Sequence, residues 1–316
     1  MGVQAVSALM RSGTGGYVSI TTSVSRPKIT TSTIQEKKQR HEPITSLTAY
    51  DYATARLVDE AGIDVILVGD SLAMVVLGYE NTLPVTMEEM LHHVRAVRRA
   101  VKHALLVADM PYASYHVSSK EGLHNAARFV KQAGAEAVKI EGGEKRVNLI
   151  RRLIDAEIPV FGHIGLTPQS VNTMGGYKVQ GKTVAAIDQL MRDAIAIDRA
   201  GVSAMILEGI PREVASMITA EVKCPTIGIG AGPDCDGQIL VLHDILNLTF
   251  AAPAKFVRRY GDAGALISTA VNAFKNDVER HAYPSDEESY HLPKDTRAAV
   301  TGVGTKRGIH LKERVV

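Results

Sequence analysis

Three acidic residues, Asp70, Asp109 and Glu141, each follow a short run of apolar residues. Carboxylates gathered in one cleft would repel one another and take up protons unless a cation balanced their charge. Mg²⁺ is commonly bound through one or two carboxylates together with water and substrate oxygens. We therefore predict a magnesium site with these three acids as candidate ligands. The alternative is that each acid caps the next helix. The occurrence of three such acids in successive units favours the metal site.

Lys139 stands two residues before Glu141 in the same apolar run. Residues two apart on a strand point to the same face of the sheet. A lysine in a protein interior needs an anionic partner. Lys139 is expected either to pair with Glu141 or to bind a substrate carboxylate beside the metal.

Glu208 ends the apolar run 204–207. A carboxylate at such a place suits a general base, although a structural salt bridge is the alternative. His163 closes another apolar run. It can cap a helix, orient a ligand or contact substrate, and all three roles stay open here.

The segment Gly228–Gly232 reads Gly-Ile-Gly-Ala-Gly and resembles a loop whose backbone N–H groups bind a phosphate. Glycines at a tight turn serve conformation equally well. The loop does not follow the first strand of the chain, as the dinucleotide-binding pattern requires, so a nicotinamide cofactor is not expected.

Short β-branched runs alternate with longer amphipathic segments, which is typical of βα units around a parallel sheet. Strands are predicted at residues 44–48, 65–68, 105–108, 137–140, 160–162, 204–207 and 226–229, with an eighth somewhere in 239–246. Eight strands with helices between them favour a closed (β/α)8 TIM barrel, of class α/β, over a doubly wound open sheet. Because the carboxyl ends of all barrel strands meet on one face, the acids can share one pocket.

Two of the helices can be predicted in more detail. Thr86 and Glu89 form a capping box, and the apolar residues after it recur at steps of three and four, at Met87, Leu91, Val94, Val97 and Val101. A second stripe, formed by Val184, Ile187, Met191 and Ala194, precedes Gly201, which is a typical helix end.

The composition excludes several classes of protein. The 316 residues carry 36 Lys or Arg against 34 Asp or Glu, scattered along the chain, so nucleic acid is not an expected partner. No apolar run approaches the ~18 residues of a membrane span, so we expect no membrane association. The two cysteines, Cys224 and Cys235, form neither a disulfide framework nor a zinc site, which favours a reducing, cytoplasmic location.

The two ends of the chain differ from the rest. Residues 1–29 are expected to be a disordered extension, 30–292 the catalytic barrel and 293–316 a solvated polar tail. The first 35 residues hold twelve Ser or Thr and no Asp or Glu, and they are expected to lack core material. The alternative is an organelle transit peptide, which would place the protein in mitochondria.

Six segments of the chain resemble, in order, those of the ketopantoate hydroxymethyltransferase family. They are GDSL at 69–72, TLPVT at 82–86, VKIEGG at 138–143, GHIGLTPQS at 162–170, GYKVQG at 176–181 and DGQILV at 236–241. The resemblance covers about residues 30–292. Ala73 and Asn247 stand where the family commonly has Gly, and Asn accepts left-handed backbone angles better than most residues.

The resemblance implies a (β/α)8 enzyme that transfers a hydroxymethyl unit from 5,10-methylenetetrahydrofolate to 3-methyl-2-oxobutanoate. The product would be 2-dehydropantoate, on the route to pantothenate and coenzyme A, and the expected cofactor is Mg²⁺. By position, Asp70 and Asp109 match the metal-binding aspartates, and Glu141 matches an acid at or beside the metal. The oxo-acid-binding positions are matched by Asp70, Ser71, Asp109 and Lys139, and the proton acceptor by Glu208. The family also implies a homo-oligomer, commonly a decamer.

Two other functions are the alternatives to this one. A Mg²⁺-dependent 2-oxo-acid lyase or mutase of the phosphoenolpyruvate mutase and isocitrate lyase type typically needs a Cys or another acid on a mobile loop. Here Cys224 begins the seventh predicted strand, at the wrong face of a barrel, and Cys235 comes after that strand. A non-catalytic metabolite-binding barrel would have no need of a proton acceptor such as Glu208.

Overall fold

The computed structural model describes residues 26–306, with side chains to residue 300. Its described part divides into two compact units, one of residues 26–242 and 251–257 and the other of 243–250 and 258–306. Residues 1–25, which make up most of the predicted extension or transit segment, and residues 307–316 of the predicted tail lie outside the described residues. None of the described helices is long and apolar enough to cross a membrane.

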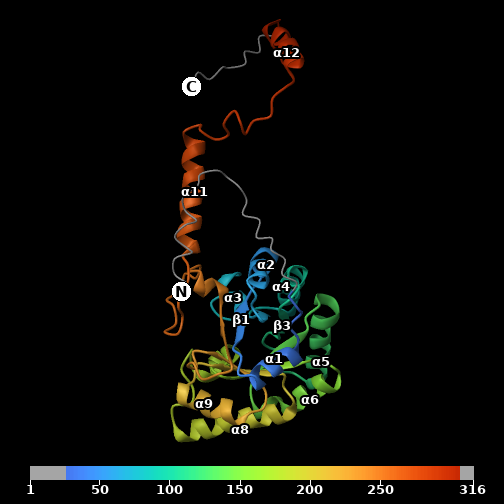
Figure 1. The fold of residues 1–316 in the computed structure, drawn as a ribbon, viewed down its shortest axis with the longest axis vertical. Coiled ribbons are helices and arrows are strands. Elements are labelled where there is room, and N and C mark those ends of the chain that lie inside the picture. Colours follow the sequence, from blue (N-terminus) through green and yellow to red (C-terminus); the bar gives the residue numbers. More distant parts are fainter. Residues whose placement is uncertain (1–25, 307–316) are drawn as a thin grey trace. The chain divides into compact units, whose positions relative to one another are not determined.

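Eight parallel strands close into a barrel in chain order, so the predicted TIM barrel is confirmed (Figure 1). The strands are β1 Ile44–Thr48, β2 Val65–Val68, β3 Leu105–Asp109, β4 Ala137–Glu141, β5 Val160–Gly165, β6 Ala204–Glu208, β7 Thr226–Ile229 and β8 Gly237–Leu240. The prediction for β8 was wrong in its bounds, because the strand begins at Gly237, before the predicted window. A Cβ at Gly237 would lie 2.4 Å from the carbonyl oxygen of Ile44 on β1, so the close approach of the two strands requires glycine.

The helices follow the strands around the outside of the barrel (Figure 1). In the first unit they are α1 Thr31–Gln39, α2 Tyr52–Glu60, α3 Leu72–Val75, α4 Met87–Ala100, α5 Ser119–Arg128, α6 Val147–Asp155, α7 Val171–Met174, α8 Val184–Ala200 and α9 Arg212–Glu221, with short turns η1 Phe129–Ala133, η2 Glu144–Arg146 and η3 Pro168–Ser170. Both halves of the predicted capping box of α4 are present at Thr86 and Glu89.

Helix α8 ends at Gly201 as predicted, but its buried stripe differs from the predicted one. Val184 is 75% exposed, and the buried residues include Leu190, Ala194 and Ile197. The helix therefore packs on the barrel through its second half, where the buried residues recur at steps of four and three.

Helix α1 closes the amino-terminal end of the barrel. Ile34 is fully buried and belongs to one cluster with inward-facing strand residues such as Ile44 and Ile227. Lys37 lies 2.6 Å from a carboxylate oxygen of Asp64, which precedes β2. The expectation that the first 35 residues lack core material was therefore wrong, because a single isoleucine in a polar helix fills the barrel end.

Replacing Ile34 by Ala is expected to lower the free energy of unfolding by about 2–5 kcal/mol, because a cavity would remain between the strands. Urea unfolding followed by circular dichroism measures the change. Leu57→Ala is the control, since Leu57 on α2 is 62% exposed and surface substitutions usually change stability by about 0.5 kcal/mol or less. An unchanged urea midpoint for Ile34→Ala would show that α1 does not contribute to the core.

The second unit contains α11 Ala263–Glu279 and α12 Lys294–Lys306, and α10 Leu242–Ile245 spans its start. Asn247 adopts a left-handed backbone angle, with φ of 55°, as expected of an Asn in a glycine position. Its side-chain amide donates to Asp262, the N-cap of α11. The second helix of this unit, α12, falls within the predicted polar tail, and its described side chains are exposed.

Candidate active site at the carboxyl ends of the strands

The predicted site residues come together at the carboxyl ends of four neighbouring strands and in the loop after β2. Asp109 ends β3 and pairs in register with Lys139 of β4, and Glu141 of β4 pairs with His163 of β5. Asp70 joins them because its backbone N–H donates to a carboxylate oxygen of Asp109 at 3.2 Å. All five side chains belong to residues that are at most 4% exposed. The barrel thus gathers the acids in one buried cluster.

Lys139 lies among the carboxylates of this cluster. Its Nζ is 2.9 Å from Oδ1 of Asp109 and 3.6 Å from Oε1 of Glu141. Burial lowers the pKa of Lys139, but the charges of Asp109, Glu141 and Asp70 outweigh that effect and raise it. The ammonium group therefore keeps its proton. Its nearest acid is Asp109, a pairing that the spacing of Lys139 and Glu141 did not indicate.

His163 lies between the acid cluster and Glu208. Its Nε2 is 3.2 Å from Oε2 of Glu208, and its Nδ1 is 3.4 Å from Oε1 of Glu141. Burial and the charge of Lys139 lower the pKa of His163, but the two carboxylates outweigh them and raise it to about 9. The imidazole thus lies between two acids, and its Nδ1 is also 3.1 Å from Nζ of Lys139.

Glu208 is the more accessible member of the group. It ends β6 opposite Gly165 of β5, and its side chain is 18% exposed, against 2% for that of His163. A carboxylate at the rim of a buried cluster can reach a bound molecule without losing its contact with the imidazole.

Ser71 lies next to this cluster, between Asp70 and α3. Its Oγ is 2.8 Å from the hydroxyl of Tyr50, with either group able to donate. This hydrogen bond holds a hydroxyl group beside the acids, at a place where it could contact an oxygen of a bound molecule.

The cluster includes two further residues for which the sequence predicted no functional role. Gln169, in the turn η3 after β5, donates from its side-chain amide to Asp70 at 2.9 Å. Tyr115, in the loop after β3, donates from its hydroxyl to the amide oxygen of Gln169 at 2.7 Å. Gln169 lies inside one of the segments that carry the family resemblance, and its place directly after a strand is the signal that could have identified it.

The charges of the cluster favour a bound cation. Burial raises the pKa of Asp70 well above its ordinary value, and the charges of Asp109 and Glu141 raise it further. Burial also raises the pKa of Asp109, against the lowering effect of Lys139. Among the described residues, Asp109 Oδ1 and Glu141 Oε1 are buried oxygens without a hydrogen-bond donor of suitable geometry.

The side chains fit Mg²⁺ that is held partly by oxygens from outside the protein. No group of three or more His, Cys, Asp or Glu in the described chain is arranged to enclose a metal ion by itself. Mg²⁺ commonly takes only one or two carboxylates and completes its coordination with water and substrate oxygens. Asp70 and Asp109 supply the hard oxygen donors that this requires, and Glu141 lies beside them.

The glycine-rich segment after β7 is accounted for by packing. At Gly230, with φ of 61°, a Cβ would lie 2.5 Å from the ring of Phe256. At Gly232, with φ of 80°, it would lie 2.3 Å from Cβ of Arg212. These contacts favour the conformational interpretation of the loop over phosphate binding.

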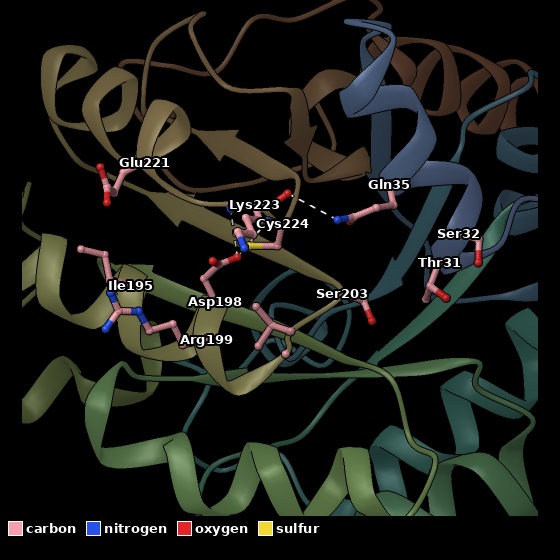
Figure 2. A pocket seen from close by; sticks show the side chains of 12 residues that line it. Thr31, Ser32, Gln35, Ile195, Asp198, Arg199, Ser203, Glu221, Lys223 and Cys224 are labelled. Carbon is pink, nitrogen blue, oxygen red and sulfur yellow. Dashed lines mark hydrogen bonds between the residues drawn. The ribbon is translucent and has the colours of Figure 1, made fainter.

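The buried cysteine lies at the opposite end of the barrel. Figure 2 shows a pocket of about 830 Å³ that is lined by Thr31 and Gln35 of α1, by Asp198 of α8 and by Cys224. The carboxylate of Asp198 accepts the backbone N–H of Cys224 at 2.8 Å. Burial raises the pKa of the Cys224 thiol, and the negative charge of Asp198 raises it further. Cys224 is therefore a protonated thiol on the face away from the acids, as its place in the sequence predicted.

The barrel is similar to solved structures of low sequence identity. One is phosphonopyruvate hydrolase in complex with oxalate and Mg²⁺, with a TM-score of 0.54, 14% identity and coverage of 89% of this chain and 98% of that chain. Another is 2,3-dimethylmalate lyase, a member of the PEP mutase and isocitrate lyase superfamily, with a TM-score of 0.54, 15% identity and coverage of 90% and 95%. At this identity the likeness shows the fold alone.

Much closer relatives are found among characterised families. A protein of Koribacter versatilis named 3-methyl-2-oxobutanoate hydroxymethyltransferase is 72% identical, over 92% of this chain and 98% of its own length. One of the same name from Syntrophomonas wolfei is 51% identical, over 85% and 97%. The sequence model of the ketopantoate hydroxymethyltransferase family matches residues 28–286. The chain belongs to the ketopantoate hydroxymethyltransferase family.

Proposed function

We propose that the protein transfers a hydroxymethyl unit from 5,10-methylenetetrahydrofolate to 3-methyl-2-oxobutanoate. In this reaction the C3–H bond of the oxo acid breaks and a C–C bond forms to the methylene carbon. Water supplies the hydroxyl group, the two C–N bonds of the methylene carbon break, and tetrahydrofolate leaves with two N–H protons that balance those lost from C3 and from water. The observation that carries the proposal is the buried cluster of Asp70, Asp109 and Lys139 beside Glu208, in a chain 72% identical to a relative of that name.

Asp70 and Asp109 would hold Mg²⁺, with Glu141 at or beside it. The bound ion would draw electron density from the 2-oxo group and so make the C3 proton easier to remove. Glu141 keeps its charge, because Lys139 and His163 lower its pKa despite the opposing effect of burial. Its Oε1, which faces Lys139 and His163 at 3.6 Å and 3.4 Å, can accept a hydrogen bond from a water molecule beside them.

Lys139 and Ser71 would bind the carboxylate of the oxo acid. The ammonium group is retained in the interior, as its raised pKa indicates, so it offers a fixed positive charge. Its contact with Asp109 at 2.9 Å places this charge next to the proposed metal ligand. In a 2-oxo acid the carboxylate and the keto oxygen are adjacent. Such a molecule could therefore contact the Lys139 ammonium group and the proposed Mg²⁺ at the same time.

Glu208 would remove the C3 proton. Its carboxylate lies at the rim of the cluster, and one of its oxygens is 3.2 Å from Nε2 of His163. The other oxygen is left to face a substrate above the buried acids. Proton removal by a positioned carboxylate is a general-base step, to which such groups typically contribute rate factors of about 10²–10⁴.

A product assay with ¹³C-labelled methylenetetrahydrofolate, 3-methyl-2-oxobutanoate and Mg²⁺ tests this function. We expect labelled 2-dehydropantoate by mass spectrometry. Conversion of phosphonopyruvate instead would support the lyase or mutase alternative, and binding of the oxo acid without any product would support a metabolite-binding barrel. The cytoplasmic location, the folate pocket and a homo-oligomer such as a decamer stay predictions.

Binding of Mg²⁺ is expected to strengthen as pH rises from 5 to 8. The raised pKa values of Asp70 and Asp109 mean that these acids hold protons at a pH where an ordinary carboxyl group has lost them. A cation must displace such protons, so below the raised pKa of each acid every proton displaced lowers the dissociation constant by about tenfold per pH unit. Calorimetry in buffers of different ionisation enthalpy counts the released protons. Equal affinity at pH 5 and pH 8 would contradict this account of the acids.

A further inference from the structure

The side chain of Gln169 is fully engaged inside the acid cluster. Its Nε2 donates to Oδ2 of Asp70 and to the backbone oxygen of Met110, both at 2.9 Å. Its Oε1 accepts from the hydroxyl of Tyr115 at 2.7 Å, and its backbone N–H donates to Oε2 of Glu141 at 3.0 Å. Gln169 is only 4% exposed, so no bulk water can replace these partners. One residue thus contacts two of the three carboxylates.

The hydrogen bonds allow one orientation of the Gln169 amide. The Tyr115 hydroxyl accepts the backbone N–H of Glu141 at 3.1 Å, and its own hydrogen points to Gln169. A flipped amide would turn its oxygen toward Asp70 and the Met110 carbonyl, so that three acceptors would meet without a donor. Tyr115 therefore keeps the two N–H groups of the amide aimed at Asp70 and Met110.

This orientation counteracts the repulsion within the cluster. The hydrogen bond from Gln169 gives Oδ2 of Asp70 a fixed donor beside the other acids, at 2.9 Å. The same residue fixes Glu141 through its backbone, and it ties the loop after β3 to the turn after β5. The carboxylates are consequently held apart and aligned before any ligand arrives.

We propose that Gln169 is a positioning residue, oriented by Tyr115, that sets the affinity of the acid cluster for a divalent cation. The inference rests on the magnesium site of the proposed function, and it concerns residues to which that function assigns no role. Groups that hydrogen-bond to metal ligands typically change metal affinity by about 10–100-fold when they are removed.

The test compares Mg²⁺ binding by calorimetry in the full-length wild type and in three variants. Gln169→Met keeps the length of the side chain and the backbone N–H to Glu141 but removes both amide donors. Tyr115→Phe keeps the amide and removes the hydroxyl that orients it. The control is Gln189→Met, since Gln189 is exposed on α8, where its amide oxygen accepts from Arg192.

We expect Gln169→Met to raise the Mg²⁺ dissociation constant by about 10–100-fold. Tyr115→Phe should raise it by a smaller factor, and Gln189→Met should leave it unchanged. The rate of C3 exchange at saturating Mg²⁺ should stay within a few-fold of wild type, whereas the Mg²⁺ concentration for half-maximal rate should rise with the dissociation constant. A merely structural role would lower the midpoint of thermal unfolding but would not raise the half-maximal Mg²⁺ concentration while the rate at saturating Mg²⁺ is kept.

The outcomes distinguish the inference from the function on which it rests. If the wild type binds Mg²⁺ and both Gln169→Met and Tyr115→Phe bind it equally well, the positioning role is wrong and the magnesium site stands. If Gln169→Met does not fold, unchanged affinity in Tyr115→Phe overturns the role alone. If the wild type binds no Mg²⁺ at millimolar concentration, the magnesium site of the proposed function is itself wrong.

Discussion

Replacing Glu208 by Gln is expected to slow exchange of the C3 proton of 3-methyl-2-oxobutanoate by about 10²–10⁴-fold. The amide keeps the size of the side chain and can still contact His163, which lies 3.2 Å from the carboxylate in the wild type. It cannot accept the proton, so the loss falls on the chemical step. Proton NMR of the oxo acid in D₂O measures the rate.

Affinity for Mg²⁺ and for the oxo acid should change little in Glu208→Gln, because the proposed ligands of both lie on β3, on β4 and in the loop after β2. Glu213→Gln is the matched control, since Glu213 is an exposed acid on α9, five residues farther along the chain. Exchange at the wild-type rate in Glu208→Gln would show that another group removes the proton.

Replacing Lys139 by Met is expected to damage both stability and substrate binding. The variant leaves Asp109 and Glu141 buried without their cation, now at 2.9 Å and 3.6 Å. Removal of one partner from a buried ion pair typically costs about 3–5 kcal/mol. The KM for the oxo acid should rise as well, because the fixed positive charge proposed to bind its carboxylate is lost.

The pH dependence of this loss has a definite sign. In Lys139→Met the folded protein holds its carboxylates at a raised pKa, so it binds more protons than the unfolded chain. Its stability deficit is therefore smallest at low pH and grows as pH rises from the ordinary carboxyl pKa towards the raised pKa of the folded protein. Urea unfolding at pH 5 and pH 8 tests this. The control is Lys275→Met, which removes an exposed ion pair with Glu279 that is worth about 0–1 kcal/mol. An equal loss in both variants would mean that Lys139 does not stabilise the cluster.

The sequence predicted the barrel and the meeting of its acids because both follow from strong, repeated signals. Seven strands coincide with the predicted runs of apolar residues, and parallel closure brings the ends of such strands to one face. Asp70, Asp109 and Glu141 could be found from their place after those runs alone. Their roles needed the family resemblance, since spacing left helix capping and salt bridges open.

The features that were missed depend on contacts between distant residues. Gly237 begins β8 because the backbone of β1 approaches it closely, and a glycine carries no hydrophobic signal. Ile34 fills the end of the barrel from a helix that is otherwise polar. The hydrogen bonds of Gln169 join loops that are 54 residues apart at Tyr115 and 99 residues apart at Asp70, and periodicity does not detect such pairs.

The most direct test of the account is exchange of the C3 proton of 3-methyl-2-oxobutanoate in D₂O, without folate, before and after removal of Mg²⁺. Deprotonation at C3 by this cluster requires no second substrate, so it isolates the proposed chemistry of Asp70, Asp109 and Glu208. We predict rapid exchange with Mg²⁺, its loss after exhaustive chelation and its return when Mg²⁺ is restored. Exchange that continues at the same rate after chelation, or that is absent under all three conditions, would contradict the account.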